Sequence, residues 1–188
     1  MIELYIFRHG QTDWNKEGRL QGHSDIALNE TGIKQATGLS KKFEKLKIDH
    51  IFSSDLIRAK LTAELALGKN IPMTLEPGLR EVNIGDYEGL QKDQLPKSFN
   101  LDAWLARGEN LKFPNGESKE DHLQRIVSTI QAITKNTQHK RLAISTHGGS
   151  MARLLEYCPN YKDDRILENC ALVKVTLKED LFQFESFL

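Results

Sequence analysis

The 188-residue chain has few cysteines, no net charge and no long apolar segment. Its two cysteines, Cys158 and Cys170, form no CxxC pair, which argues against a zinc ribbon and a disulfide-stabilised scaffold. Lysine plus arginine number 26 and aspartate plus glutamate also 26, and this balance argues against a nucleic-acid partner or a basic membrane-surface protein. No apolar run approaches the roughly 20 residues of a membrane-spanning helix. Because Met1–Glu3 is not a basic leader, we expect a cytoplasmic protein.

The composition suits one folded domain. Hydrophobic residues make up 39% and charged residues 28% of the chain, and this length can bury a core without disulfides. No internal repeat, low-complexity segment or linker divides the sequence, so residues 1–188 are predicted to form a single domain. No HExxH or similar pair has metal-ligand spacing, and we expect neither a metal ion nor another cofactor.

Strand and helix patterns alternate along the chain. Short apolar runs predict strands at 4–7, 48–53, 73–75 and 142–145, and a closing hairpin of strands at 171–177 and 181–187. Helices are predicted at 31–45, 56–67, 118–134 and 150–157. Residues 11–29 and 79–89 are expected to be loops, and 90–116 a partly helical excursion over one edge of the sheet. Strands separated by helices imply an α/β domain with a mainly parallel sheet.

The helix starts are predicted from local capping residues. Asn29 or Thr31 is expected to begin the first helix, Ser54 or Asp55 the second, and Ser118 the third. The first helix is expected to bury Ile33, Ala36, Leu39 and Phe43, and the third Leu123, Ile126, Val127 and Ile130.

Polar side chains follow the ends of three predicted strands. The first strand ends in Arg8-His9-Gly10, the second leads to Arg58 on the following helix, and a later strand ends in His147-Gly148-Gly149. Because ligands bind at the carboxyl ends of parallel strands, we expect these groups to share one crevice. Two arginines, two histidines and the amino termini of helices suit a tetrahedral dianion such as phosphate.

Each feature alone also has a purely structural interpretation. A histidine at a strand end is more often structural than catalytic, and Arg58 would usually be a solvated helix residue. His147-Gly148-Gly149 would also fit a tight turn that needs glycine. The other histidines show no partner pattern and are assigned to the surface or the core: His23, His50, His122 and His139.

A longer set of motifs covers nearly the whole chain. It consists of Arg8-His9-Gly10, Asn15, Gln21-Gly22, Asp25 and Leu28, then Ser53–Leu56, Arg58-Ala59 and Thr62-Ala63, then Leu79–Glu81, Gly85 and Glu88-Gly89, and finally Asn115–Ser118, His147–Gly149 and Arg153. In this order the set resembles the histidine phosphatase superfamily, in its phosphoglycerate mutase-like branch. The resemblance implies a three-layer sandwich, with a mainly parallel central sheet, helices on both faces and a small insertion at about 90–116.

The resemblance also implies roles for the matching residues. His9 would be the nucleophile that accepts a phosphoryl group, and Glu81 the proton donor to the leaving group. Arg8, Arg58 and His147 would form the phosphate pocket and belong to the catalytic set. The substrate would also contact Asn15, Gln21, Gly22 and Gly148.

Elementary electrostatics agrees with these roles. A histidine nucleophile must be neutral, and cations at Arg8 and Arg58 would favour its neutral form. The same cations would offset charge in the transition state of phosphoryl transfer, so no metal is required. Glu81 must carry a proton to act as an acid, and its carboxylate could then activate water against the phosphohistidine.

Two departures from the mutase pattern favour a phosphatase. Mutases that resemble this family are longer and carry an insertion after the region of Glu81, whereas here Glu88–Leu90 leads quickly to Pro96. Gln11 stands where mutases usually have glutamate. We expect hydrolysis of a small phosphorylated metabolite by a monomer or homodimer, with a cofactor-dependent phosphoglycerate mutase as the alternative. Three aromatic residues of the insertion region could stack on the substrate, although packing on the core is favoured: Phe99, Trp104 and Phe113.

Two other function classes fit less well. Residues Gly148–Ala152 approximate the nucleophile elbow of serine hydrolases, but that fold places its catalytic histidine after the serine. All six histidines here precede Ser150. A non-catalytic binding module would not need His9, Glu81 and the rest of the set together.

Overall fold

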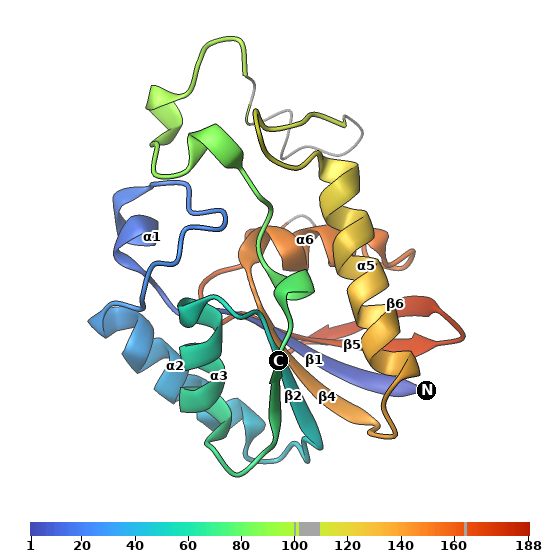
Figure 1. The fold of residues 1–188 in the computed structure, drawn as a ribbon. Helices are drawn as coiled ribbons and strands as arrows, with labels where there is room; N and C mark the ends of the chain where they lie inside the picture. Colours follow the sequence, from blue (N-terminus) through green and yellow to red (C-terminus); the bar gives the residue numbers. More distant parts are fainter. Residues whose placement is uncertain (100, 102–109, 164) are drawn as a thin grey trace.

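A six-stranded sheet forms the centre of the computed structural model, which describes residues 1–99, 101, 110–163 and 165–188 (Figure 1). The strand order is β3-β2-β4-β1-β5-β6. The strands are β1 (Ile2–Arg8), β2 (His50–Ser53), β3 (Met73–Leu75), β4 (Arg141–Thr146), β5 (Leu172–Lys178) and β6 (Leu181–Phe187). β1, β2, β3 and β4 pair in parallel, while β5 is antiparallel to both β1 and β6. The mainly parallel sheet and the closing hairpin are therefore confirmed.

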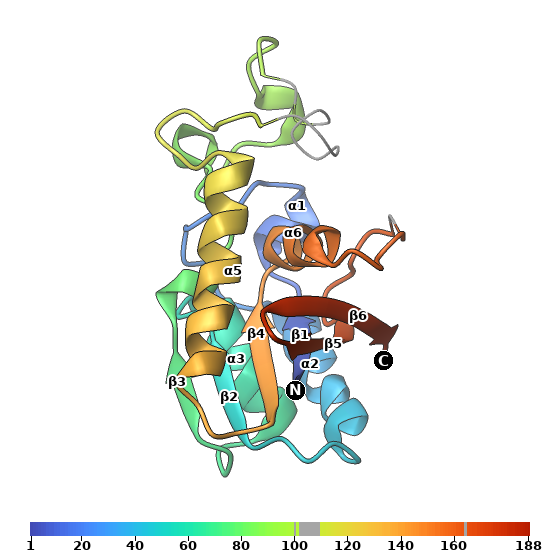
Figure 2. The same cartoon turned by 90° about the vertical axis from the view of Figure 1, so that its right-hand side faces the viewer.

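Side chains that alternate along the strands pack against helices on both faces of the sheet. Leu4 and Ile6 of β1 belong to the core under α5 (Lys119–Lys135) and α6 (Gly148–Tyr157). Tyr5 and Phe7 point to the opposite core, under α2 (Glu30–Phe43) and α3 (Ile57–Leu67). Because successive side chains of a strand alternate between faces, a run buried on both sides reads as continuously apolar. The result is the predicted three-layer sandwich (Figures 1 and 2).

The first long helix begins as predicted and buries Ala36, Leu39 and Phe43 as predicted, but not Ile33. The Asn29 side chain accepts a hydrogen bond from the Gly32 amide (2.9 Å) and caps α2. Ile33, which was expected to be buried, is 40% exposed, whereas Gly32 is buried. A Cβ atom on Gly32 would lie 2.0 Å from the Gln11 carbonyl oxygen. The backbone after β1 therefore packs against Gly32, at the side of the helix where Ile33 was expected to be buried.

The capping prediction for α3 is wrong. Leu56 occupies the N-cap position and provides no side-chain hydrogen bond. The Ile57 amide instead donates to Asp25 Oδ1 (2.7 Å), a residue far away in sequence. The cap of α5 is local, as predicted, and Ser118 forms a capping box with Asp121. On that helix Leu123 is only half-buried, and His122 is fully buried instead.

Short helices interrupt the segments that were expected to be loops. Residues 11–29 contain α1 (Asp13–Glu17), which begins with a capping box between Thr12 and Asn15. This helix has no buried residue, so it lacks the apolar periodicity that would reveal it. Three 3-10 helices follow β3: η1 (Pro77–Leu79), η2 (Gly85–Tyr87) and η3 (Lys92–Gln94).

The described part of 90–116 includes η3 and extends beyond the carboxyl ends of the parallel strands (Figure 1). It lies at one end of the molecule, close to α1 (Figures 1 and 2), and Leu90 accepts a hydrogen bond from the Leu20 amide (2.9 Å). Phe99 and Phe113 pack on each other and on Tyr87, with ring centroids 4.9–6.0 Å apart. These two rings therefore pack in a small apolar cluster with Tyr87. Trp104 lies outside the described residues.

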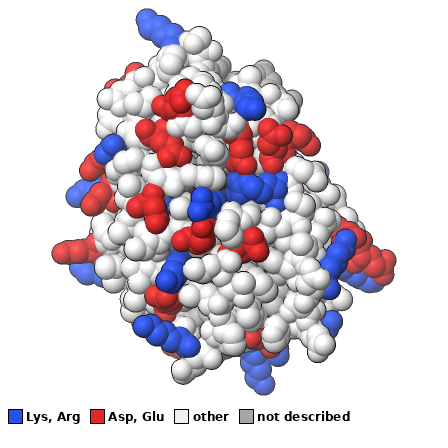
Figure 3. Space-filling model, in the orientation of Figure 1, with Lys and Arg blue, Asp and Glu red and all other residues white. Residues whose placement is uncertain are grey.

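The surface agrees with the neutral composition. On the face shown in Figure 3, the described basic and acidic side chains are interspersed.

None of the helices within 1–99, 110–163 and 165–188 is long and apolar enough to cross a membrane. The expected absence of a nucleic-acid partner and the expected monomer or homodimer stay predictions.

Candidate active site

The carboxyl ends of β1, β2 and β4 meet in register at one edge of the sheet. Arg8 is the partner of Thr146, and the His9 amide donates to the Thr146 carbonyl (3.1 Å). The rings of His9 and His147 consequently lie edge to face, with centroids 5.2 Å apart. Parallel pairing thus brings together residues that are far apart in the sequence.

His9 has a defined tautomer. Its ring is buried, and Nδ1 lies 2.7 Å from the Gly10 carbonyl oxygen, which can only accept a hydrogen bond. Nδ1 therefore carries the proton, and Nε2 keeps its lone pair. Burial, followed by the positive charges of Arg58 and Arg8, holds the pKa of His9 well below its usual value. The imidazole is neutral at neutral pH, as a nucleophile requires.

Arg58 and His147 are fully buried next to His9. The Arg58 guanidinium donates to the carbonyl oxygens of Ser24 (2.7 Å) and Gly22 (2.8 Å), and burial lowers its pKa to about 10. His147 Nε2 lies 2.9 Å from Ser54 Oγ, and burial, then Arg58, lower the pKa of this imidazole well below its usual value. Both side chains therefore have protein partners in this structure.

A cavity of about 700 Å³ opens at this edge of the sheet. Seven of the predicted site residues line it: Arg8, His9, Asn15, Gln21, Gly22, Glu81 and Gly148. Its described wall does not include Arg58 or His147. The structure thus gathers all nine predicted residues around one centre, with two of them outside the cavity wall.

The cavity end next to His9 is built for an anion. Arg8 Nη1 donates to the Leu167 carbonyl (2.6 Å), while Arg8 Nε and Gln21 Oε1 are buried without a hydrogen-bond partner among the described residues. A Cβ atom on Gly148 would lie 3.1 Å from Arg8 Nε, so glycine lets the guanidinium approach the first turn of α6. Amides at a helix amino terminus and a guanidinium both favour negative charge.

Glu81 lies against the same helix start. Its Oε2 accepts from the Gly149 amide (2.8 Å) and its Oε1 from the Val82 amide (3.0 Å). A Cβ atom on Gly149 would lie 2.5 Å from Glu81 Oε1. Gly149, which has no Cβ atom, therefore permits this contact with Glu81.

Asn15 and Gly22 shape the wall through the backbone around them. Asn15 Oδ1 lies 3.2 Å from the Thr12 amide, which closes the capping box of α1. Gly22 has φ +54°, and its carbonyl accepts from Arg58. A Cβ atom on Gly22 would lie 2.5 Å from Glu88 Oε1, so glycine is required by both space and backbone conformation.

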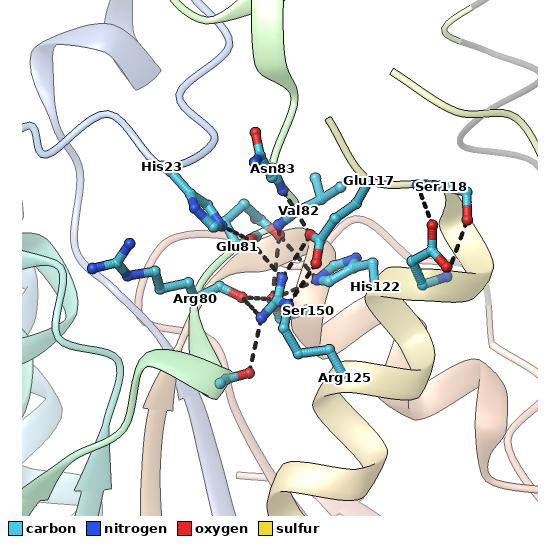
Figure 4. A network of polar contacts seen from close by, with 12 residues as sticks. His23, Arg80, Glu81, Val82, Asn83, Glu117, Ser118, His122, Arg125 and Ser150 are labelled. Atoms are coloured by element: carbon cyan, nitrogen blue, oxygen red, sulfur yellow. Dashed lines mark hydrogen bonds and ion pairs between the residues drawn. The ribbon is translucent and has the colours of Figure 1, made fainter. Parts of the chain in front are cut away.

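The sequence interpretation missed a clamp that holds the Glu81 segment (Figure 4). Arg125 on α5 donates to the carbonyl oxygens of Gly78 (2.8 Å), Arg80 (3.0 Å) and Glu81 (2.9 Å). Its guanidinium also pairs with Glu117, at 2.7 Å for Nε to Oε1. Glu117 lies within a motif noted above, but the role of Arg125 gives no local signal, because the carbonyl oxygens that it binds are 44 to 47 positions away along the chain.

Among the described residues, no group of three or more histidine, cysteine, aspartate and glutamate side chains is arranged to hold a metal ion. The charge at the site is supplied by arginines and backbone amides. His23 has its Nε2 2.9 Å from the Glu81 carbonyl, so it belongs to the clamp rather than to a metal site.

Lower pH is expected to destabilise the fold through buried histidines. The pKa values of His9, His122 and His147 are lowered in the folded state, mainly by burial, so below about pH 6.5 the unfolded chain binds protons that the folded chain does not. Each such proton lowers the free energy of unfolding by about 1.4 kcal/mol per pH unit. Urea unfolding at pH 8, 6.5 and 5.5 measures this slope.

The matched control is a substitution on the same helix that removes no titrating group. His122→Gln should reduce the slope by about one proton, whereas Ser128→Ala, at an exposed position of α5, should leave it unchanged. A free energy of unfolding that is constant between pH 8 and 5.5 would contradict the prediction.

Comparisons with known proteins cover nearly the whole chain. Residues 4–187 match the histidine phosphatase superfamily (branch 1). The chain is 35% identical to “Probable phosphoglycerate mutase GpmB” of Erwinia tasmaniensis, over 93% of this chain and 85% of that protein. It is 33% identical to the protein of the same name from Cronobacter sakazakii, over 95% of this chain and 86% of that protein.

Solved structures agree with the fold. The crystal structure of a phosphoglycerate mutase from Thermus thermophilus superposes with a TM-score of 0.80 at 30% identity, covering 100% of this chain and 98% of that one. A candidate alpha-ribazole-5'-P phosphatase from Escherichia coli has a TM-score of 0.85 at 23% identity, covering 99% and 95%, and shares the fold. With this match and these relatives, the chain belongs to the histidine phosphatase superfamily and is an enzyme of its phosphoglycerate mutase-like branch.

Proposed function

We propose that the protein hydrolyses a phosphomonoester through a phosphohistidine intermediate on His9. The observation that carries the proposal is the 2.7 Å contact between His9 Nδ1 and the Gly10 carbonyl, which leaves Nε2 unprotonated in a ring that lines the cavity. The lowered pKa of His9 supports the same role. Trapping of a phosphoenzyme, described in the Discussion, tests the proposal.

The proposed reaction has two steps. His9 Nε2 attacks phosphorus and the ester oxygen departs with a proton from Glu81, while Arg8 and the Gly148 amide bind the phosphoryl oxygens. The Glu81 carboxylate then takes a proton from water, which attacks phosphorus and releases inorganic phosphate and neutral His9. Direct contact of Arg58 and His147 with the phosphoryl group stays a prediction. In the present arrangement we assign Arg58 to holding the turn at 22–24 and to favouring neutral His9.

The wall of the cavity supports a substrate with an apolar organic part. Beyond Arg8 and His9, side chains of Leu20, Ile84 and Phe113 line the cavity, and so does Leu167. The other described arginines of the wall each face a carboxylate: Arg19 at 3.4 Å from Glu17, Arg153 at 2.9 Å from Glu156 and Arg165 at 2.5 Å from Asp163. A second anionic group on the substrate would therefore compete with a carboxylate for each of these cations. This favours a phosphatase over a mutase for glycerate phosphates.

The alternative is a cofactor-dependent phosphoglycerate mutase, and the names of the relatives favour it. The two activities differ in the final acceptor of the phosphoryl group. Incubation with 3-phosphoglycerate and a catalytic amount of the bisphosphate separates them: a mutase forms 2-phosphoglycerate, and a phosphatase releases inorganic phosphate.

An apolar cavity predicts that activity rises with the length of an alkyl leaving group. Ethyl, butyl and hexyl phosphate have leaving groups of similar basicity, so differences among them report on binding. Each buried methylene should raise kcat/KM about fourfold, as expected from about 0.8 kcal/mol per methylene. Phosphate release measured for the three esters tests this, and a kcat/KM for 3-phosphoglycerate above that for butyl phosphate would contradict it.

A further inference from the structure

We propose that His122 and Ser150 position the Glu81 carboxyl group, through a buried hydrogen-bonded chain between α5 and α6. The inference rests on the proposed role of Glu81 as proton donor. His122 Nε2 lies 3.0 Å from Ser150 Oγ, which lies 3.3 Å from Glu81 Oε1. Figure 4 shows the three side chains converging from α5, α6 and the loop after β3.

The polar pair lies between an apolar core and the charged groups around Glu81. His122 and Ser150 are fully buried where α5 meets α6, beside the core that contains Ile126, Met151 and Leu154. Burial of a polar group is unfavourable unless it is hydrogen-bonded, and two apolar side chains would fill the same space. Packing alone therefore does not explain a histidine and a serine here, whereas their contact with Glu81 does.

The direction of the hydrogen bonds follows from the unpartnered ring nitrogen. His122 Nδ1 is buried and has no hydrogen-bond partner among the described residues. A buried N–H without an acceptor costs more than a buried lone pair, so the proton belongs on Nε2, which donates to Ser150 Oγ. Burial lowers the pKa of His122 to about 4, so the ring is neutral at neutral pH.

The charged groups around His122 are consistent with a neutral ring. Glu81 and Glu117 favour its protonation, Arg125 and Arg153 oppose it, and burial outweighs them all. A neutral ring can donate to the serine without placing a full positive charge 3.9 Å from Glu81 Oε1.

The serine hydroxyl can hold Glu81 in both of its protonation states. Ser150 Oγ lies 3.0 Å from the Arg80 carbonyl and 3.3 Å from Glu81 Oε1. When Glu81 carries its proton on Oε2, the hydroxyl can donate to Oε1, and it can keep that hydrogen bond to the carboxylate after proton transfer. Glu81 is thus held in one place in both steps, and Ser150 and His122 act as positioning residues.

The test compares variants on two kinds of substrate. Ser150→Ala and His122→Leu should each lower kcat for butyl phosphate about 3- to 10-fold, as expected for one lost hydrogen bond, with KM nearly unchanged. p-Nitrophenyl phosphate, whose leaving group needs no proton, should keep its kcat/KM within twofold. His122→Gln, which retains an amide N–H, should restore activity toward butyl phosphate. The matched control is Ser128→Ala, at an exposed position on α5.

A double variant connects the pair to Glu81. In a Glu81→Gln background, Ser150→Ala should cause no further loss on butyl phosphate, because both changes remove the same function. Equal losses on both substrates, additive losses, or full activity of Ser150→Ala would each overturn the proposal. Alanine is small and favours helix, so this variant tests the proposal even where His122→Leu fails to fold. If Glu81→Gln itself shows no preference between the substrates, the proposed role of Glu81 fails instead.

Discussion

Replacement of His9 by alanine is expected to abolish turnover and phosphoenzyme formation together. The variant lacks His9 Nε2. Among the described residues that line the cavity, this is the only ring nitrogen that can act as an unprotonated nucleophile. For a covalent nucleophile we expect kcat to fall by about four orders of magnitude or more. Rapid quench with labelled substrate should trap an acid-labile, alkali-stable phosphoprotein in the wild type and none in the variant.

The control for this experiment is His139→Ala, because His139 is exposed and lies outside the cavity wall. It should retain wild-type turnover and labelling. Undiminished turnover of His9→Ala would rule out the phosphohistidine mechanism. A labelled phosphoprotein in His9→Ala would assign the nucleophile to another residue.

Replacement of Glu81 by glutamine is expected to slow alkyl phosphates far more than aryl phosphates. An alkoxide leaves only with a proton, whereas p-nitrophenolate leaves without one, so only the first reaction needs the acid. General acid catalysis typically contributes about 10²- to 10⁴-fold, and we expect a loss of that size in kcat/KM for butyl phosphate. The parameter kcat/KM is chosen because it reports the steps up to phosphorylation of His9.

Hydrolysis of the phosphohistidine, the second step, should also depend on Glu81, here as the base. Without its carboxylate, water attacks the phosphohistidine slowly, and p-nitrophenyl phosphate should give a burst of nitrophenol followed by a slow steady state. Glu120→Gln is the matched control, since Glu120 is exposed on the first turn of α5. Equal losses of kcat/KM on both substrates, without a burst, would argue against a proton donor at this position.

Much of the secondary structure followed from local pattern. The continuous apolar run of β1 predicted a strand covered on both faces, and Leu4 and Tyr5 indeed point to opposite cores. Asn29 and Ser118 cap their helices through amides three residues away, an interaction that depends only on neighbouring sequence. Such features are readable because their physical causes lie within one turn or one strand.

Other starts and faces depended on distant contacts. The amide at the start of α3 is capped by Asp25, and on α2 the backbone of Gln11 packs against Gly32 while Ile33 is exposed. No local pattern records these contacts. The helix α1 escaped prediction for a related reason, since a five-residue helix without a buried side chain has no periodicity to detect.

For the candidate site, the sequence by itself determined the residue types and their order. His9 and His147, recognised in their motifs, lie around one centre because parallel strands end at one edge, and Glu81 joins them through its hydrogen bond to the start of α6. Only the tertiary structure decided what each of them contacts. The tautomer of His9, the carbonyl partners of Arg58 and the chain from His122 to Glu81 all depend on atoms placed within about 3 Å by packing. Hydrogen bonds act over that short range and are highly directional, and residue spacing along a chain carries no information about them.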